Sequence, residues 1–206
     1  MTVKTVFFDI GGVILTNGWD RHQRRATIEE FRLDYDEFQD RHEFLAHDFE
    51  TGQLDLPEYL KRTVFYRERD FSREEFTASV FARSRELPGS IEFLDELKST
   101  GLQLASLNNE SREINEHRIR TFALNERLSL FLSSCYLGVK KPEAAIYELA
   151  LRITQRRPEE CVFVDDRALN LECAADAGMD GVLFTGVEDL RLALTQREVL
   201  SPPTGS

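Results

Sequence analysis

Short apolar segments that each end in polar residues constrain the fold of this chain more than any other feature. Such β-branched and aromatic runs are typical of buried strands, and glycines directly after a run indicate a tight turn. The runs and their polar ends are residues 3–8 with Asp9 and then Gly11-Gly12, residues 102–107 with Asn108-Asn109, and residues 161–164 with Asp165-Asp166. Two further strands are expected at residues 133–137 and 181–185.

Helical segments separate these strands along the second half of the chain. The apolar spacing predicts helices at about residues 91–101, 111–122, 142–153, 169–177 and 187–194. In the third of these, Ile146, Leu149, Ala150 and Ile153 are expected to face the core. Strands that alternate with helices form mostly parallel sheets covered on both faces, so the chain is predicted to be a doubly wound (Rossmann-like) α/β protein.

A different texture interrupts this pattern after the first strand. From about residue 19 to residue 83 the apolar positions follow a helical period, and Phe38, His42, Leu45 and Phe49 share one face. Four short helices packed as a bundle are expected there. We therefore predict a core made of residues 1–16 and 87–200, a helical insertion at residues 17–86, and a disordered tail at residues 201–206.

Charge and cysteine content exclude several classes of protein. The formal net charge of −11 argues against nucleic-acid binding, which needs a positive surface. The three cysteines, Cys135, Cys161 and Cys173, form no CxxC pair, so we expect reduced thiols and no zinc site. No export signal and no apolar stretch of about 20 residues is present. We expect a cytoplasmic protein without membrane or nucleic-acid partners, and the sequence leaves its oligomeric state open.

The polar strand ends predict a site, because the carboxyl ends of parallel strands meet at one edge of a sheet. Asp9, Asn109 and the pair Asp165-Asp166 should converge there with Lys141, which precedes a helix. Clustered carboxylates repel one another unless a cation lies between them, and Mg²⁺ prefers such oxygen ligands. An aspartate can attack phosphorus, and a lysine can offset phosphate charge and keep that aspartate ionised.

Four further sequence segments follow one another in a fixed order. They are FFDIGGVI at residues 7–14, LNN at 107–109, KKPE at 140–143 and VFVDDRALN at 162–170. In this order they resemble the four motifs of the haloacid dehalogenase-like hydrolases, and the resemblance covers nearly the whole chain to about Thr185. The insertion lies where one subclass of that family carries a helical cap, and the chain is similar to its glucose-1-phosphate phosphatase-type members.

The resemblance implies a Mg²⁺-dependent phosphatase that acts on a small phosphorylated metabolite, in particular a sugar phosphate. Asp9 would be the nucleophile and carry an aspartyl-phosphate, and Asn170 would orient the acidic loop. The metal would be held by Asp9, Asp166, the backbone carbonyl of Gly11, and Asp165 in or beside its outer shell. The phosphoryl group would be held by Lys141, Asn108, Asn109, Gly11 and Gly12.

Two departures from the family pattern leave alternatives open. Gly11 stands where typical phosphatases carry a second aspartate as general acid and base, and positioned acid catalysis is worth typically about 10²- to 10⁴-fold. Asn108 stands where Ser or Thr is usual. Gly11 would be compatible with activity if the leaving group departs without much help, such as an anomeric or acyl oxygen, or if a proton donor comes from elsewhere. The alternatives are a regulatory protein that binds phosphate without turnover, and a metal-free 2-haloacid dehalogenase, which the Asp165-Asp166 pair disfavours.

Overall fold

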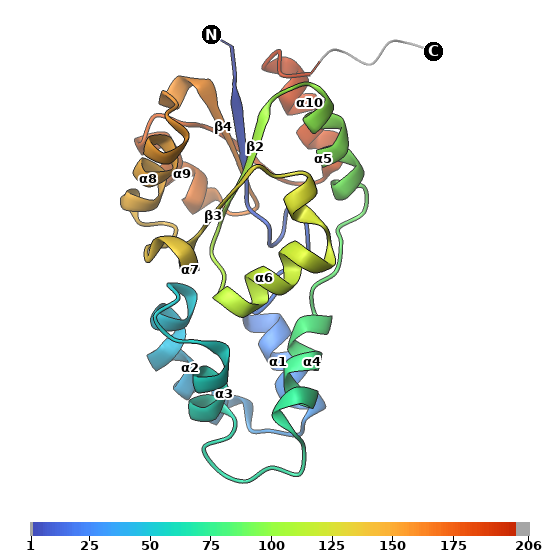
Figure 1. Ribbon diagram of the computed structural model, residues 1–206, viewed down its shortest axis with the longest axis vertical. Helices are drawn as coiled ribbons and strands as arrows, with labels where there is room; N and C mark the ends of the chain where they lie inside the picture. The colour runs from blue at the N-terminus through green and yellow to red at the C-terminus, as the bar shows by residue number, and fades with distance from the viewer. Residues whose placement is uncertain (1, 201–206) are drawn as a thin grey trace.

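A five-stranded parallel sheet forms the centre of the computed structural model, which describes residues 2–200 (Figure 1). The strand order is β3-β2-β1-β4-β5, and every neighbouring pair runs parallel. This order confirms the predicted doubly wound α/β fold. The strands are β1 (Thr5–Phe8), β2 (Gln103–Asn108), β3 (Leu130–Ser133), β4 (Cys161–Asp165) and β5 (Asp180–Leu183).

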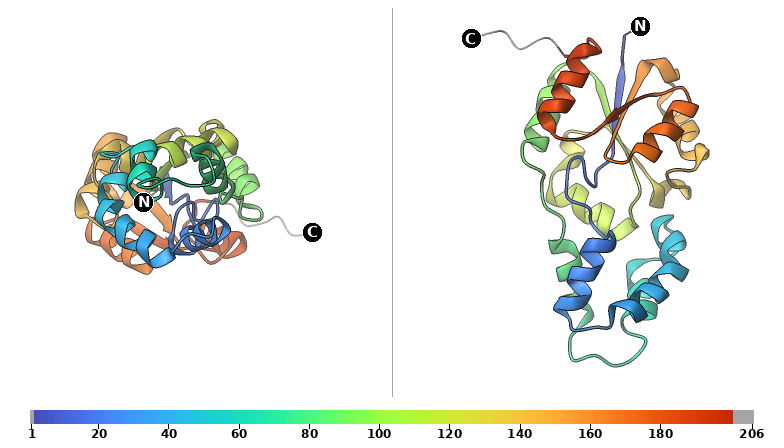
Figure 2. Two further views of the ribbon diagram at one scale, coloured as in Figure 1. Left: turned by 90° about the horizontal axis from the view of Figure 1, so that it is seen from below. Right: turned by 180° about the vertical axis from the view of Figure 1, so that it is seen from behind.

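Helices cover both faces of the sheet because successive strand side chains point to opposite sides. Val6 and Phe8 pack in one apolar cluster with α5 (Ser90–Ser99) and α10 (Val187–Gln196), whereas Phe7 packs in another with α8 (Ala144–Thr154) and α9 (Ala168–Asp176). Figure 2 shows the two layers from below and from behind. The remaining core elements are α6 (Arg112–Thr121), α7 (Ser134–Leu137) and the 3₁₀ turns at Leu124–Glu126 and Pro158–Glu160.

Two details of the core differ from the prediction. The strand expected at residues 133–137 is wrong, because β3 pairs with β2 through Leu130 to Ser133 and the following residues form the short helix α7. The buried face of α8 is made by Ile146, Tyr147, Ala150 and Thr154, and Ile153 is 45 % exposed. The helix begins at Ala144 and is rotated so that its aromatic residue, rather than Ile153, meets the sheet.

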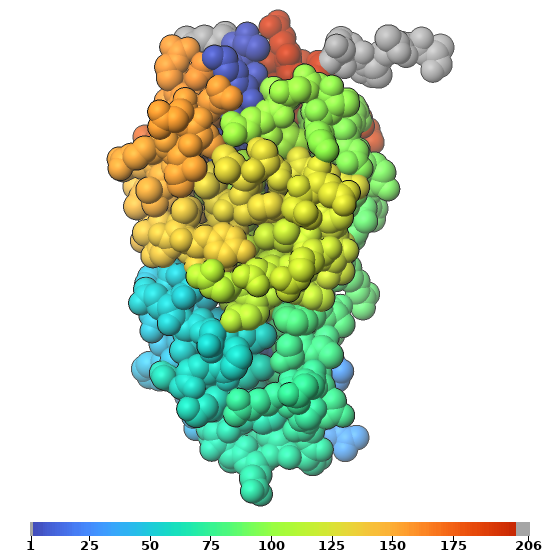
Figure 3. Space-filling model, in the orientation of Figure 1, coloured from blue at the N-terminus to red at the C-terminus, as the bar shows by residue number. Residues whose placement is uncertain are grey.

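The helical insertion, residues 17–86, contains α1 (Arg21–Glu30), α2 (Tyr35–Glu50), α3 (Leu56–Thr63) and α4 (Arg73–Ala82). It forms a separate lobe beyond the carboxyl edge of the sheet (Figures 1 and 3). Each helix is preceded by an N-cap residue whose side chain accepts a hydrogen bond from a backbone N–H of the first turn, which stabilises the helix by about 1 kcal/mol. The N-cap residues are Asp20, Asp34, Asp55 and Ser72.

An aromatic core holds the four helices together. Trp19, Phe38 and Phe76 pack edge to face, and Phe49 stacks on Tyr59 at 4.0 Å between ring centroids. Ile114 of α6 joins the same apolar cluster, so the core contributes to the base of this lobe. The division of the chain into core and cap at residues 16/17 and 86/87 stays a prediction.

The insertion meets the core on two sides. On one side its two connecting segments pair with each other, because the Thr16 N–H donates to the Arg85 carbonyl at 2.8 Å and the Leu87 N–H to the Ile14 carbonyl at 3.0 Å. On the other side, the Oγ of Ser134 donates to the Glu50 carbonyl at 2.6 Å.

Two remaining expectations concern a membrane-spanning helix and the C-terminal tail. None of the helices within residues 2–200 combines the length and the apolar character needed to cross a bilayer. The tail that we expect to be disordered, residues 201–206, lies outside the described residues.

Candidate active site

Three carboxylates meet at the carboxyl edge of the sheet. Asp9 follows β1, Asp165 ends β4, and one oxygen from each of Asp9, Asp165 and Asp166 lies within 4.8 Å of the others. The Asp9 N–H donates to the Val164 carbonyl at 2.9 Å, which sets Asp9 beside the acidic pair. The structure thus brings together the acidic residues that the sequence pattern placed at separate strand ends.

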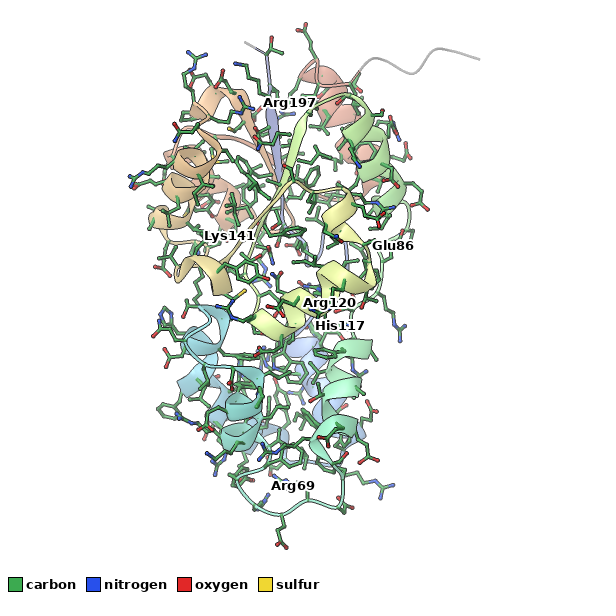
Figure 4. All side chains as sticks on the ribbon, viewed as in Figure 1. Arg69, Glu86, His117, Arg120, Lys141 and Arg197 are labelled. Atoms are coloured by element: carbon green, nitrogen blue, oxygen red, sulfur yellow. The ribbon has the colours of Figure 1, made fainter. Side chains whose placement is uncertain are left out.

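Lys141 points into this cluster rather than toward solvent. Its Nζ lies 2.6 Å from Asp165 Oδ2 and 3.2 Å from Asp9 Oδ2, and the side chain is buried. Figure 4 shows it in the interior between the sheet and the insertion. Asn109 fixes the lysine backbone, since its Nδ2 donates to the Lys141 carbonyl at 2.8 Å and its Oδ1 accepts from the Lys141 N–H at 2.9 Å. A phosphate oxygen could accept a hydrogen bond from the second N–H of the Asn109 amide.

The two neighbouring aspartates have different surroundings. Asp165 is fully buried and accepts hydrogen bonds from Lys141, from the Arg167 N–H at 2.8 Å, and from Asn170 Nδ2 at 3.0 Å to both oxygens. Asp166 Oδ1 is buried and has no hydrogen-bond donor among residues 2–200. Because a buried carboxylate oxygen without a partner is costly, this atom fits a cation ligand. Asn170 thus contacts the acidic loop, and its implied role in orienting that loop stays a prediction.

The charge balance in the cluster is unfavourable to ionised Asp9 in the protein alone. Burial raises the pKa of Asp9 to about 6, Lys141 opposes that rise, and Asp165 and Asp166 add to it. Lys141 thus favours the ionised form of Asp9, in the predicted direction, although burial keeps the pKa above its ordinary value. A divalent cation among the three carboxylates would favour their ionised forms, so the donor set fits Mg²⁺ in charge and in atom type.

The two glycines after Asp9 have distinct geometric tasks. Gly11 lines the pocket, and a Cβ atom at this position would lie 2.8 Å from Asn17 Oδ1. Asn17 thus occupies the space that a side chain at position 11 needs. At Gly12 (φ +80°), a Cβ atom would lie 2.3 Å from Asp166 Oδ2, so only glycine lets the carboxylate approach.

Two predicted phosphate contacts have other partners in the structure. The Gly12 N–H, predicted to bind phosphate, donates instead to the Leu15 carbonyl at 2.7 Å. The Asn108 side chain is buried and bonds to Asn115 at 3.1 Å and to Ser133 at 2.8 Å, beside β3. Both side-chain groups of Asn108 thus have protein partners, but its amide, like that of Asn109, has a second N–H, so the phosphate contact stays a prediction.

A pocket of about 480 Å³ connects the acidic cluster with the insertion. Asp9, Gly11, Asn109 and Lys141 form its floor, and a more open hollow of about 680 Å³ at the opposite edge of the sheet contains none of the predicted residues. Sequence reasoning missed most of the other walls. They include Asn17, Trp19, Arg21, Arg24, His42, Phe49, Glu50, Glu110, Arg118, Lys140 and Arg167.

Trp19 and His42 are two of these wall residues, and they share a hydrogen-bond partner. Trp19 belongs both to the apolar core of the insertion and to the pocket wall, and its Nε1 donates to the Tyr59 hydroxyl at 3.0 Å. His42, which shares an apolar helical face with Phe38 and Phe49, lies 2.9 Å through Nδ1 from the same hydroxyl. Burial, with the charges of Arg24 and Lys140, lowers the pKa of His42 to about 3, so this ring is neutral.

A buried ion pair between Glu110 and Arg118 also escaped the sequence reasoning. Arg118 Nη1 lies 3.0 Å from Glu110 Oε2, and Arg118 also donates to the Thr16 carbonyl. A Cβ atom at Gly18 would lie 2.6 Å from Glu110 Oε2, so the pair supports the segment that enters the insertion. The position of Glu110 directly after Asn109 was the only sequence indication of such a role.

Parts of this chain are similar in sequence to known proteins. It is 29 % identical over 152 residues to flavin mononucleotide hydrolase 1 of Arabidopsis thaliana, covering 73 % of this chain and 60 % of that protein. It is 29 % identical over 119 residues to glyceraldehyde 3-phosphate phosphatase of Pyrococcus furiosus, covering 57 % of this chain and 50 % of that protein. The chain thus spans less than two thirds of either relative.

A solved structure and a family model extend the likeness to most of the chain. A haloacid dehalogenase family enzyme of Bacteroides thetaiotaomicron, in its magnesium complex, superposes with a TM-score of 0.76 at 18 % identity, covering 94 % of this chain and 99 % of that one. That likeness shows the fold. The family model for haloacid dehalogenase-like hydrolases matches residues 3–178, and this chain therefore belongs to the haloacid dehalogenase-like hydrolase family.

Proposed function

We propose that this protein is a Mg²⁺-dependent phosphatase for a small phosphorylated metabolite, in particular a sugar phosphate. The observation that carries the proposal is the contact of Lys141 with Asp9 and Asp165 at the floor of a pocket walled by the insertion. A lysine beside two carboxylates suits phosphoryl transfer, because one carboxylate can attack phosphorus while the lysine offsets the charge of the phosphoryl oxygens. Family membership and the phosphatase activities named for two relatives support it.

Each residue of the cluster has a task in this proposal. Asp9 attacks phosphorus and holds the phosphoryl group until water releases it. Lys141 offsets the negative charge that builds up on the phosphoryl oxygens, and Asn109 keeps Lys141 in place. Asp9, Asp166 and the Gly11 carbonyl would hold the Mg²⁺, with Asp165 beside it. When bound, Mg²⁺ supplies positive charge that stabilises the transition state.

The leaving group receives no proton from position 11. Gly11 has no side chain, and the neutral amide of Asn17 occupies the space beside it. We therefore propose that preferred substrates carry an oxygen that departs without strong acid assistance, such as an anomeric or acyl oxygen.

The observation at Asn17 also favours a second candidate. A chain that keeps the phosphate site but fills the place of the general acid with an amide could bind phosphorylated metabolites without turning them over. A 2-haloacid dehalogenase is disfavoured, because halide would be expelled beside Asp165 and Asp166, whose charges repel it.

A panel of phosphate esters assayed with Mg²⁺ and with EDTA tests the proposal. We expect Mg²⁺-dependent release of phosphate by the wild-type protein and none by Asp9→Asn. Metabolite binding without release, and without beryllofluoride bound at Asp9, would favour the regulatory candidate instead. The expected cytoplasmic location and the expected lack of nucleic-acid and membrane partners stay predictions.

A further inference from the structure

The insertion side of the pocket contains a buried arginine that no carboxylate neutralises. Arg24 of α1 is 8 % exposed and lines the same pocket as Asp9 and Lys141. Its Nη1 donates to the Trp19 carbonyl at 2.6 Å and its Nε to Gln39 Oε1 at 3.3 Å. Over residues 2–200, no carboxylate oxygen lies within 4.0 Å of its guanidinium nitrogens.

The other cations of the pocket are either paired with a carboxylate or, like Arg21 and Arg167, exposed to solvent. Lys141 contacts Asp9 and Asp165, Lys140 lies 2.8 Å from a Glu50 oxygen, and Arg118 lies 3.0 Å from a Glu110 oxygen. An arginine stays charged in proteins, and a buried charge is costly unless an opposite charge offsets it. The carbonyl and amide oxygens beside Arg24 accept hydrogen bonds from it but carry no net charge.

The other side chains of this part of the pocket carry both signs of charge. Lys140 pairs with Glu50, the exposed Arg21 follows Asp20, and His42 is neutral there. The rings of Trp19 and Phe49 form the apolar part of the wall. A ligand that bridges the pocket thus meets the phosphoryl site at one end and a guanidinium without a counterion at the other.

We propose that Arg24 binds a second anionic group of the substrate, either a carboxylate or a second phosphate. The preferred substrates are then phosphorylated metabolites with an anionic group at the end away from the phosphate that is cleaved. The planar fork of a guanidinium matches both kinds of oxyanion through paired hydrogen bonds. This inference rests on the proposed phosphatase function and makes Arg24 a specificity-determining residue of that site.

Matched substrate pairs test the inference. We would compare kcat/KM for glucuronic acid 1-phosphate with that for glucose 1-phosphate, which differ in a carboxylate, and for glucose 1,6-bisphosphate cleaved at C1 with that for glucose 1-phosphate, which differ in a phosphate. The proteins are the wild type, Arg24→Gln, Arg24→Lys and Arg69→Gln. Arg69 is a matched control, because it also donates to a backbone carbonyl, that of Val64 at 2.8 Å, but lies at the far tip of the insertion (Figure 4).

We expect the wild type to favour the member with the extra anion in at least one pair, and that pair identifies the anion. Arg24→Gln should lower this kcat/KM ratio by at least about tenfold, and Arg24→Lys, which keeps the charge but not the fork, should lower it less. Arg69→Gln should leave the ratio unchanged. A wild type without preference, or a ratio that Arg24→Gln does not alter, would overturn the inference while the phosphatase proposal stands.

Two further measurements keep the test decisive. If the wild type hydrolyses no ester, the proposed function fails, and calorimetric binding of glucuronic acid 1-phosphate and glucose 1-phosphate to Asp9→Asn still examines Arg24. Equal affinities for these two compounds would then refute it. If Arg24→Gln does not fold, the preference of the wild type and the ratio for Arg24→Lys decide the question.

Discussion

Removal of Arg118 should destabilise this protein more than the loss of any surface ion pair. The Arg118 and Glu110 side chains are 2 % and 8 % exposed, and 3.0 Å separates their charged atoms. Arg118→Met leaves Glu110 buried without its counterion and removes the donor to the Thr16 carbonyl. Loss of one partner of a buried pair costs about 3–5 kcal/mol, which for a chain of this size corresponds to a fall of roughly 6–20 °C in Tm.

Urea and thermal unfolding, followed by circular dichroism, measure this cost. The matched control is Arg67→Met, because Arg67 also lies 3.0 Å from a carboxylate oxygen, that of Glu37, but both side chains are well exposed. That substitution should cost less than about 1 kcal/mol. The double variant Glu110→Gln/Arg118→Met should recover much of the loss, because it leaves no buried charge. Equal costs for Arg118→Met and Arg67→Met would refute the reasoning.

The cost of Arg118→Met should also depend on pH. Burial raises the pKa of Glu110 from 4.5 to about 7, even though Arg118 opposes this. Because the native state then binds the proton more tightly than the unfolded chain, the contribution of Glu110 is complete below pH 4.5 and is lost as pH rises through about 7. That shift corresponds to about 3 kcal/mol, measured as the wild-type stability relative to Glu110→Gln. The loss in Arg118→Met should therefore be larger near about pH 8 than near about pH 5.

Two glycine substitutions give further predictions, each with a control of matching φ but without neighbours within 4 Å. Gly12→Ala places a Cβ atom 2.3 Å from Asp166 Oδ2, so the Mg²⁺ concentration for half-maximal activity should rise at least about tenfold, whereas Gly101→Ala should not change it. Gly52→Ala places a Cβ atom 2.2 Å from a carbonyl oxygen of α7, so it should lower Tm and speed hydrogen exchange at the end of α2 more than Gly138→Ala does. Equal effects within either pair would show that backbone strain alone is responsible.

The sequence predicted the parts of the site that depend on local pattern and parallel topology. Asp9, Asp165 and Asp166 each follow an apolar run, and parallel strands bring such ends together without further information. Lys141 follows the same logic at the start of a helical segment. The bounds of β3 were harder to predict, because the run Leu130 to Leu132 and the segment after Ser133 are similarly apolar.

Residues that depend on tertiary contacts could not be identified from the sequence. Arg24 lies in the run Arg21-His-Gln-Arg-Arg, where its charge looks the same as that of its neighbours. Only the folded chain shows that it is buried against Trp19 and Gln39 without a counterion. Likewise Asn17 matters because its amide enters the space beside Gly11, which no spacing rule reveals.

The attachment of the insertion has a consequence for how ligands enter and leave. Two paired segments, through Thr16 and Arg85, form an axis on one side, whereas the opposite side is fastened by Ser134 and Lys140, which both bond to Glu50. Swinging about that axis would break these polar contacts and shift the insertion against Ile114 of α6, whereas the contacts of Trp19 with Phe38 and Phe76 lie within the insertion. The fastening at Glu50 is therefore the place where changes would alter the rate of ligand exchange without touching the residues that react.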